Sequence, residues 1–120
     1  MIHHDVLIVG SGVMGVALAN SIDSDELSVG IIESNPQPSI SKRHLSINQK
    51  SLNFLKDLDV WKEIERNAYP YRKIKVWDQE GSGYIEFDSQ EADIDLLGHI
   101  VSEGKIQESL IDGLKSKKVN

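Results

Sequence analysis

Three glycines and one glutamate near the start of the sequence have the residue types and spacing that point most directly to chemistry. Gly10, Gly12 and Gly15 form a Gly-x-Gly-x-x-Gly motif. The first permits a tight turn, the second lets the backbone approach a pyrophosphate, and the third lets a helix pack closely on a strand. Glu33 follows at the offset of about 20 residues expected of a ribose-binding acid. Residues 10–15, the glycine turn, are therefore predicted to bind a dinucleotide at a helix N-terminus.

Glu33 narrows the choice of dinucleotide. Its carboxylate would accept hydrogen bonds from an adenosine ribose, and its negative charge would repel a 2′-phosphate at that position. FAD or NAD is therefore favoured over NADP as the ligand of the glycine turn. Val13 and Met14 lie between the last two glycines, and both are included among the predicted cofactor-binding residues.

The flanking segments read as the elements that position this turn. Val6 to Val9 is a continuous apolar run, typical of a central parallel strand that is buried on both faces. A helix is expected to begin inside the turn and to pack one apolar stripe on the sheet. That stripe contains Val13, Met14, Ala17, Leu18 and Ile22. A second apolar run, residues 27–32, ends at Glu33, so residues 1–33 are predicted to form a βαβ unit of a Rossmann-like α/β domain.

The middle of the chain reads as a loop followed by helices. Residues 34–42 are rich in Asn, Pro, Gln and Ser, which favour loops. Ser46 and Gln49 have the spacing of a capping box, and they predict a helix from Ile47 to about Asp57. A short helix is expected over Val60 to Arg66.

The second half departs from simple strand and helix alternation. Two β-rich segments surround a glycine-containing turn, and they predict a β-hairpin over residues 72–90 as an excursion toward a substrate domain. Residues 98–101 return as an extended segment, and a closing helix is expected over 102–116. Val119 then lies where a further strand would start. Because 120 residues are fewer than a complete enzyme of this class needs, the chain is expected to be a truncated N-terminal portion.

Composition excludes several classes of function. A net charge of −6 and a pI near 5.1 disfavour a nucleic-acid surface. The absence of cysteine excludes disulfides, thiolate metal sites and a cysteine nucleophile. The N-terminal apolar run is too short to span a bilayer. The expected location is the cytoplasm, with peripheral association at the inner membrane left open.

No catalytic or metal-binding constellation follows from spacing alone. His3 and His4 lie at a terminus, which makes a poor metal cage. The acidic stretch from Asp88 to Asp95 lacks the glycine and terminal glutamate of a calcium loop and is interpreted as a solvated loop. His44 and His99 have no partners at a catalytic spacing and are interpreted as structural. No metal site is predicted, and no catalytic residue is assigned.

Further segments resemble one known family in the same order along the chain. These are Arg43 to Asn48, Leu58 to Trp61, Pro70-Tyr71, Val76-Trp77-Asp78, Ile85 to Asp88, Leu97 to Val101 and Ile106-Gln107. Together with the glycine turn they resemble the ubiquinone-biosynthesis hydroxylases, in particular the 2-octaprenylphenol hydroxylase type. The members of this family are FAD-dependent aromatic-ring monooxygenases.

The resemblance implies both a reaction and site residues. NAD(P)H would reduce the flavin, and the reduced flavin would use O2 to hydroxylate a phenol that carries a polyprenyl tail. The glycine turn and Glu33 would hold the ADP half of FAD. Arg43 matches an arginine near the flavin, and Gln107 matches a glutamine that contacts the cofactor. A polyprenyl phenol substrate and an association with the membrane or a biosynthetic complex are also implied.

Two departures from the family pattern limit these expectations. The family usually has glycine where this chain has Ser11. Its Gly-Asp motif and its second NAD(P)H- and FAD-related motif would lie beyond residue 120, so the chain alone is expected to have little or no hydroxylase activity. The alternatives are an NAD-binding dehydrogenase or reductase, and a non-catalytic fragment with a partner-binding role. Ring position, oligomeric state and the choice between NADH and NADPH are left open.

Overall fold

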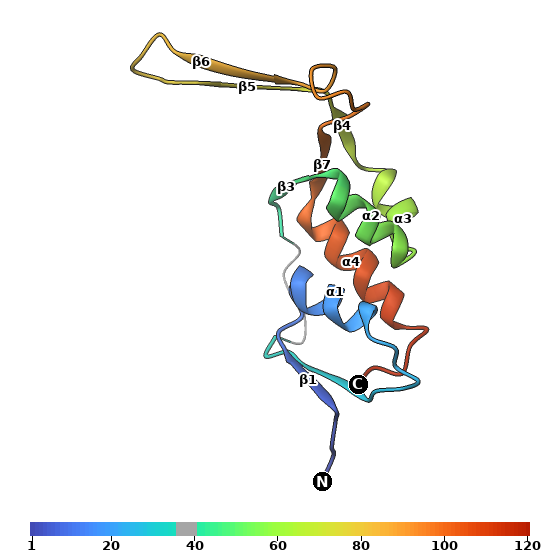
Figure 1. The fold of residues 1–120 in the computed structure, drawn as a ribbon. Helices are drawn as coiled ribbons and strands as arrows, with labels where there is room; N and C mark the ends of the chain where they lie inside the picture. The colour runs from blue at the N-terminus through green and yellow to red at the C-terminus, as the bar shows by residue number, and fades with distance from the viewer. Residues whose placement is uncertain (36–40) are drawn as a thin grey trace.

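The computed structural model describes residues 1–35 and 41–120, so part of the predicted loop at 34–42 lies outside the described residues. The chain forms an elongated molecule of 63 × 31 × 24 Å (Figure 1). Its elements in chain order are β1 (Val6–Val9), α1 (Val13–Ser21), β2 (Val29–Ile32), β3 (His44–Ile47), α2 (Gln49–Asp57), α3 (Trp61–Glu65), β4 (Tyr69–Tyr71), β5 (Lys73–Trp77), β6 (Tyr84–Asp88), β7 (Gly98–Ser102) and α4 (Glu103–Leu114).

The predicted βαβ unit is confirmed. β1 and β2 pair in parallel, with Val6 opposite Val29 and α1 as the crossover between them. The far edge of β2 receives the last residues of the chain, because Val119 forms a parallel bridge with Val29. The Ile31 N–H also donates to the Asn120 carbonyl at 2.6 Å. The further strand predicted at Val119 therefore starts at the expected place.

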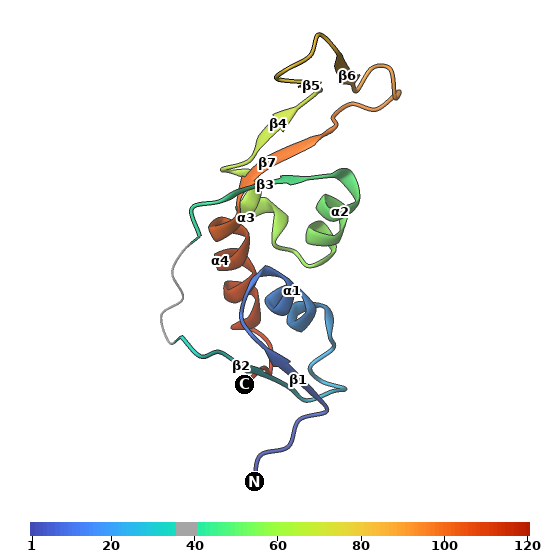
Figure 2. The same ribbon diagram turned by 90° about the vertical axis from the view of Figure 1, so that its left-hand side faces the viewer.

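β1 is not buried on both faces, and this prediction was wrong. Ile8 is buried, but Leu7 and Val9 point to the opposite face, and Val9 is 81% exposed. α1 and α4 lie on one side of the β1–β2 pair (Figure 2). Among the described residues, nothing buries Leu7 or Val9 on the other face. An apolar run indicates that a strand can be buried on both faces. It does not show that the elements that bury it lie within the same 120 residues.

The predicted apolar stripe of α1 was also wrong in part. Met14 and Leu18 are exposed, whereas the buried residues of the helix are Val16, Ala17, Ala19 and Asn20. α1 lies between the sheet and α4, so it buries small residues that permit close approach on two sides. The Asn20 side-chain amide donates to the carbonyls of Val16 and Leu110, both at 2.8 Å, and thereby joins the two helices.

A three-stranded antiparallel sheet with the order β3-β7-β4 covers the upper ends of the helices (Figures 1 and 2). β3 follows the predicted loop at 34–42 and includes Ser46 and Ile47, the expected cap and first residue of a helix. Ser46 lies within it, with its hydroxyl 2.5 Å from the Tyr71 hydroxyl, so the predicted capping role of Ser46 was wrong. Asn48 caps α2 instead, and its Oδ1 accepts from the Ser51 N–H at 2.9 Å. Pairing with β7 keeps the chain extended through Ile47, and asparagine is as good a cap as serine.

The main hydrophobic core lies among α1, α2, α3, α4 and β7. Its buried members are Val16, Ala17, Leu52, Leu55, Val60, Trp61, Ile64, Val101, Ile106 and Leu110. His99 borders this core and makes an edge contact with the Trp61 ring, with centroids 5.1 Å apart. His44 is exposed. This core fixes α4, which follows β7 of the three-stranded sheet and packs along α1 of the βαβ unit.

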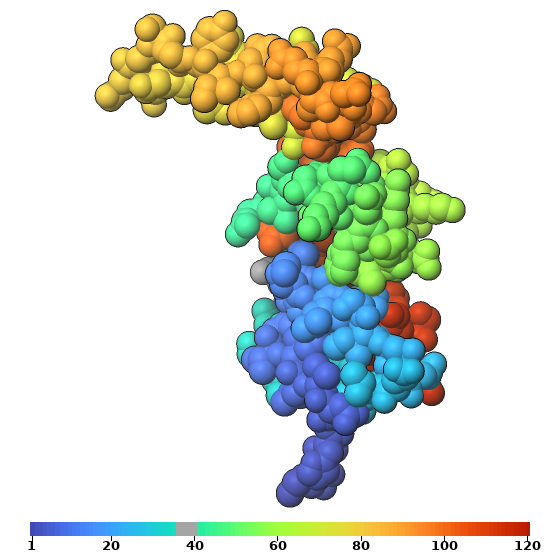
Figure 3. Space-filling model, in the orientation of Figure 1, coloured from blue at the N-terminus to red at the C-terminus, as the bar shows by residue number. Residues whose placement is uncertain are grey.

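The predicted hairpin is confirmed as β5 and β6, which pair from Lys73 opposite Asp88 to Trp77 opposite Tyr84. It projects from the rest of the molecule as an arm (Figure 3). Its apolar side chains are exposed on both faces. The acidic stretch begins with Asp88, the last residue of β6, which forms an ion pair with Lys73 at 3.3 Å. In the described part of the chain, no helix is long and apolar enough to cross a membrane.

Candidate cofactor-binding site

The glycine turn joins the carboxyl end of β1 to the N-terminus of α1. Gly10 has φ +99°, a conformation that side chains strain to adopt, and its N–H donates to the Ile32 carbonyl at 2.7 Å. A Cβ on Gly15 would lie 2.3 Å from the Gly10 carbonyl oxygen. Position 15 therefore tolerates only glycine without a backbone shift. Both glycines act as the motif predicts.

The N-terminus of α1 is open in the way that an anion requires. Gly12 is the N-cap and offers no side chain to bond the first N–H groups of the helix. A Cβ placed on Gly12 would meet no atom of the described residues within 4 Å. The side chain of Val13 packs against the main core, whereas Met14 is 82% exposed. The backbone N–H groups around Gly12 thus face free space and carry a partial positive charge.

Glu33 lies directly beside this turn. Its Oε2 accepts two hydrogen bonds from Ser11, from the N–H at 2.8 Å and from the hydroxyl at 2.7 Å. Its Oε1 accepts from the Asn35 N–H at 3.0 Å. The Ser11 hydroxyl is the largest cause that lowers the pKa of Glu33 to about 2, followed by the backbone N–H groups. Glu33 is therefore an exposed, ionised acceptor at neutral pH.

Gln107 connects α4 to the same turn. α4 begins after Ser102, whose hydroxyl accepts from the Lys105 N–H, and it packs along α1. This brings the Gln107 side-chain amide to the Ser11 carbonyl, where Nε2 donates at 2.7 Å. Gln107 is half-buried. Ser11 therefore lies between Gln107 and the Glu33 carboxylate and bonds to both.

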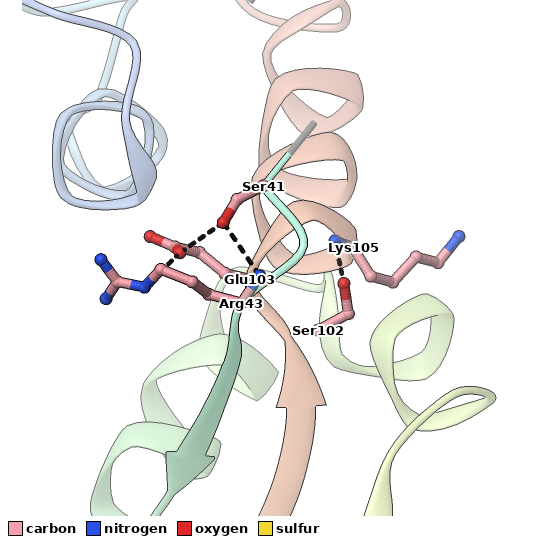
Figure 4. A network of polar contacts seen from close by, with 5 residues as sticks. All are labelled: Ser41, Arg43, Ser102, Glu103 and Lys105. Atoms are coloured by element: carbon pink, nitrogen blue, oxygen red, sulfur yellow. Dashed lines mark hydrogen bonds and ion pairs between the residues drawn. The ribbon is translucent and has the colours of Figure 1, made fainter. Parts of the chain in front are cut away.

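Arg43 is held at the N-terminus of α4 (Figure 4). Its Nε lies 3.2 Å from Glu103 Oε2, which also accepts from the Ser41 hydroxyl at 2.8 Å. The Glu103 N–H donates in turn to the Arg43 carbonyl at 2.9 Å. The arginine side chain is 74% exposed, and its two terminal nitrogens bond to none of the described residues. Figure 4 shows them directed away from α4.

Both Arg43 and the glycine turn are bound by side chains of α4. Glu103 and Gln107 are four residues apart, so they lie one above the other on one face of α4. Arg43 is bound at the first of these positions and the glycine turn at the second. The structure therefore brings the turn, Glu33, Gln107 and Arg43 to one edge of α4, although they are spread over about 100 positions of the sequence.

Three residues of this network were missed from the sequence. The sequence pattern marks Ser11 only as a departure from the glycine usual in the family, and it gives no role to Ser41 or Glu103. A signal existed for Glu103, because an acidic residue directly after a serine cap is favourable in the first turn of a helix. Ser41 offered none, since its partner lies 62 positions away.

The residues present fit a flavin dinucleotide. The open helix N-terminus suits a pyrophosphate, and the ionised Glu33 can accept from ribose hydroxyls. The terminal nitrogens of Arg43 can donate to an electron-rich or anionic group.

Comparisons with known proteins agree with this fit. The family described as "FAD binding domain" matches residues 3–111. The 3-demethoxyubiquinol 3-hydroxylase of Escherichia coli is 30% identical over 93% of this chain and 30% of its own length. The mitochondrial ubiquinone biosynthesis monooxygenase COQ6 of Dictyostelium discoideum is 27% identical over 93% of this chain and 27% of its own length. The chain thus spans less than a third of these relatives.

The fold is similar to that of solved flavoprotein structures. The crystal structure of Pseudomonas aeruginosa PqsL in complex with 2-aminobenzoylacetate superposes with a TM-score of 0.78 at 18% identity. The match covers 99% of this chain and 33% of that protein. At this identity the likeness concerns the fold alone. The profile match over residues 3–111, by contrast, shows that the chain belongs to the FAD binding domain family.

Proposed function

We propose that this chain is the FAD-binding part of a flavin-dependent monooxygenase that hydroxylates a polyprenylated phenol in ubiquinone biosynthesis. The observation that carries the proposal is the bond of 2.7 Å from Gln107 to the Ser11 carbonyl. This bond fastens the glycine turn to α4 one helical turn from Glu103, the residue that binds the exposed Arg43. The substrate class is supported by the relatives, whose names place them among ubiquinone hydroxylases.

The described residues would bind and orient the cofactor. The N–H groups at the start of α1 would bond the pyrophosphate, and Glu33 would accept from the adenosine ribose. Gln107 would keep the turn and α4 at a fixed spacing, and Arg43 would donate from its free terminal nitrogens. Bound FAD supplies the redox chemistry, which protein side chains lack.

The overall reaction balances with one reductant and one oxidant. NAD(P)H provides two electrons as a hydride, and solvent provides one proton. One oxygen atom of O2 enters the phenol ring as a hydroxyl group, and the other leaves as water. The ring is oxidised, and NAD(P)H becomes NAD(P)+. Because the described residues supply cofactor binding, the 120-residue chain by itself is expected to have little or no hydroxylase activity.

A polyprenyl tail also bears on location. Such a tail partitions into the membrane, so an enzyme acting on it must reach the membrane surface. We therefore propose a cytoplasmic protein that associates peripherally with the inner membrane or with a biosynthetic complex. The alternative of an NAD-binding dehydrogenase is not favoured by the family match.

The test of the substrate class is a product analysis. The longest natural polypeptide that contains this sequence would be loaded with FAD and incubated with a polyprenylphenol, NADH or NADPH, and 18O-labelled O2. We expect a product that carries one 18O atom on the ring. A flavin-loaded protein that oxidises NAD(P)H and leaves the polyprenylphenol unchanged would contradict the proposed substrate.

A further inference from the structure

Ser11 makes three hydrogen bonds within the site, two to Glu33 and one with Gln107. We infer that Ser11 is a positioning residue of the FAD site, which holds the Glu33 carboxylate in place for the ribose and fastens α4 to the glycine turn through Gln107. The inference rests on the binding of FAD at the glycine turn. It does not depend on the identity of the phenol.

The first argument is the convergence of two donors on one atom. The N–H and the hydroxyl of Ser11 both donate to Glu33 Oε2, at 2.8 and 2.7 Å. The Asn35 N–H donates to Oε1 at 3.0 Å. The Ser34 hydroxyl donates to the same Oε1 over a longer 3.5 Å. Together these bonds restrict the rotation of the carboxylate, and the two from Ser11 are the shortest of them.

The second argument concerns what the hydroxyl adds. A residue without a hydroxyl at position 11 would keep the N–H and carbonyl bonds, but it would lose the shorter of the two bonds to Oε2. A hydrogen bond to a charged group is stronger than one between neutral groups. The hydroxyl therefore favours the ionised, acceptor-only form of Glu33 and restricts it to one orientation.

The third argument is the link to α4. The Ser11 carbonyl accepts from Gln107 Nε2 at 2.7 Å, so one residue bonds both the ribose-side acid and the closing helix. Displacement of α4 would act on the backbone at Ser11, and with it on both donors to Glu33. Ser11 thus couples the position of the carboxylate to the packing of the domain.

The experiment compares three variants of the 120-residue chain. Ser11→Ala removes the hydroxyl, and Ser11→Thr keeps it. Threonine fits because Ser11 is not among the residues with positive φ. The matched control is Ser116→Ala, because the Ser116 hydroxyl is exposed and bonds only to the Gly113 carbonyl in the described structure.

Two readouts are needed. The first is the dissociation constant for FAD from quenching of flavin fluorescence, and the second is the titration of the Glu33 carboxyl carbon by NMR without FAD. We expect Ser11→Ala to weaken FAD binding roughly fivefold. We also expect it to move the Glu33 midpoint to higher pH, whereas Ser11→Thr and Ser116→Ala leave both readouts unchanged.

The inference is overturned if folded Ser11→Ala retains both the dissociation constant and the Glu33 midpoint of the unmodified chain. If Ser11→Ala fails to fold, the unmodified chain still decides, because a Glu33 midpoint in the ordinary range for glutamate would exclude the Ser11 bonds. If the unmodified chain binds no FAD, the FAD assignment fails, and the role of Ser11 in FAD binding fails with it. The NMR titration then still shows whether Ser11 holds Glu33.

Discussion

The Gln107 side-chain amide donates to the Ser11 carbonyl at 2.7 Å and joins two residues that are 96 positions apart. This bond fastens α4 to the glycine turn, so the distance between them does not depend on apolar packing alone. The amide N–H that makes this bond would otherwise be available to solvent. Gln107 is therefore a contact of the glycine turn and not a solvent-facing helix residue.

Removal of this amide should weaken cofactor binding more than folding. Gln107→Ala leaves the Ser11 carbonyl without its donor, and we expect the dissociation constant for FAD to rise roughly fivefold. Flavin fluorescence quenching measures this. Gln49→Ala is the matched control, because among the described residues the Gln49 side chain bonds to Asn53 alone, on the exposed surface of α2. Equal effects of the two substitutions would argue against a role for Gln107 in the site.

Gly15 should be intolerant of even one carbon atom. The Cβ of Gly15→Ala would lie 2.3 Å from the Gly10 carbonyl oxygen, a backbone atom that cannot move without opening the turn. We expect a loss of about 1–3 kcal/mol in the free energy of unfolding. The control is Gly83→Ala in the hairpin turn, where a Cβ meets no atom of residues 1–35 or 41–120 within 4 Å. Urea denaturation of both variants checks the prediction, and similar midpoints would contradict it.

The ionisation of Glu33 should make part of the stability depend on pH. Its pKa is about 2 in the folded chain, compared with 4.5 for an unperturbed glutamate. A carboxyl with a lowered folded pKa stabilises the fold above the unfolded pKa, and this contribution is lost as pH falls through the folded value. The stability advantage of the chain over Glu33→Gln should therefore be complete near neutral pH and decline between about pH 4.5 and about pH 2.

The comparison with Glu33→Gln is required because other carboxyls behave alike. Hydrogen bonds from Ser28 lower the pKa of Asp5, and the hydrogen bond with Lys118 lowers that of Asp25. Both carboxyls are present in the two proteins, so their contributions cancel. Urea midpoints measured for both proteins from pH 7 down to pH 2 give the difference. A difference that stays constant over this range would contradict the assignment.

Arg43 should bind FAD through the several N–H donors of its guanidinium group and not through charge alone. Its Nε is occupied by Glu103, while the terminal nitrogens are free among the described residues. A lysine cannot bond Glu103 and a ligand in this way. We expect Arg43→Lys to weaken FAD binding almost as much as Arg43→Ala, by about tenfold. Arg66→Ala is the control, because Arg66 forms an exposed pair with Glu63 one helical turn away. FAD titration of the three variants decides, and full retention of affinity in Arg43→Lys would contradict the prediction.

Local patterns were sufficient for the parts of the fold that sequence predicted. The glycine turn, the βαβ unit and the hairpin each depend on residues close in the chain, and each forms where expected. β3 was missed because its partner is β7, more than 50 positions away, and no local pattern records that pairing. The exposure of Val9 and Met14 was missed for a related reason, since burial depends on which elements cover a face.

The candidate site likewise contains residues that a local pattern predicts and residues whose role depends on distant partners. The turn and Glu33 follow from a motif with a fixed spacing, so composition and order were enough to find them. The anchoring of Arg43 by Glu103, and of Glu103 by Ser41, depends on the meeting of β3 with the start of α4. Ser11 lies inside the motif, but its role depends on side-chain directions that a pattern of glycines does not specify.

The central claim is that the glycine turn of this chain binds FAD. Titration of the 120-residue chain with FAD, followed by quenching of flavin fluorescence and with NADH as competitor, tests it most directly. We predict saturable binding of one FAD per chain that NADH does not displace and that Glu33→Gln weakens. Binding of NADH at the turn, with no binding of FAD, would contradict the account.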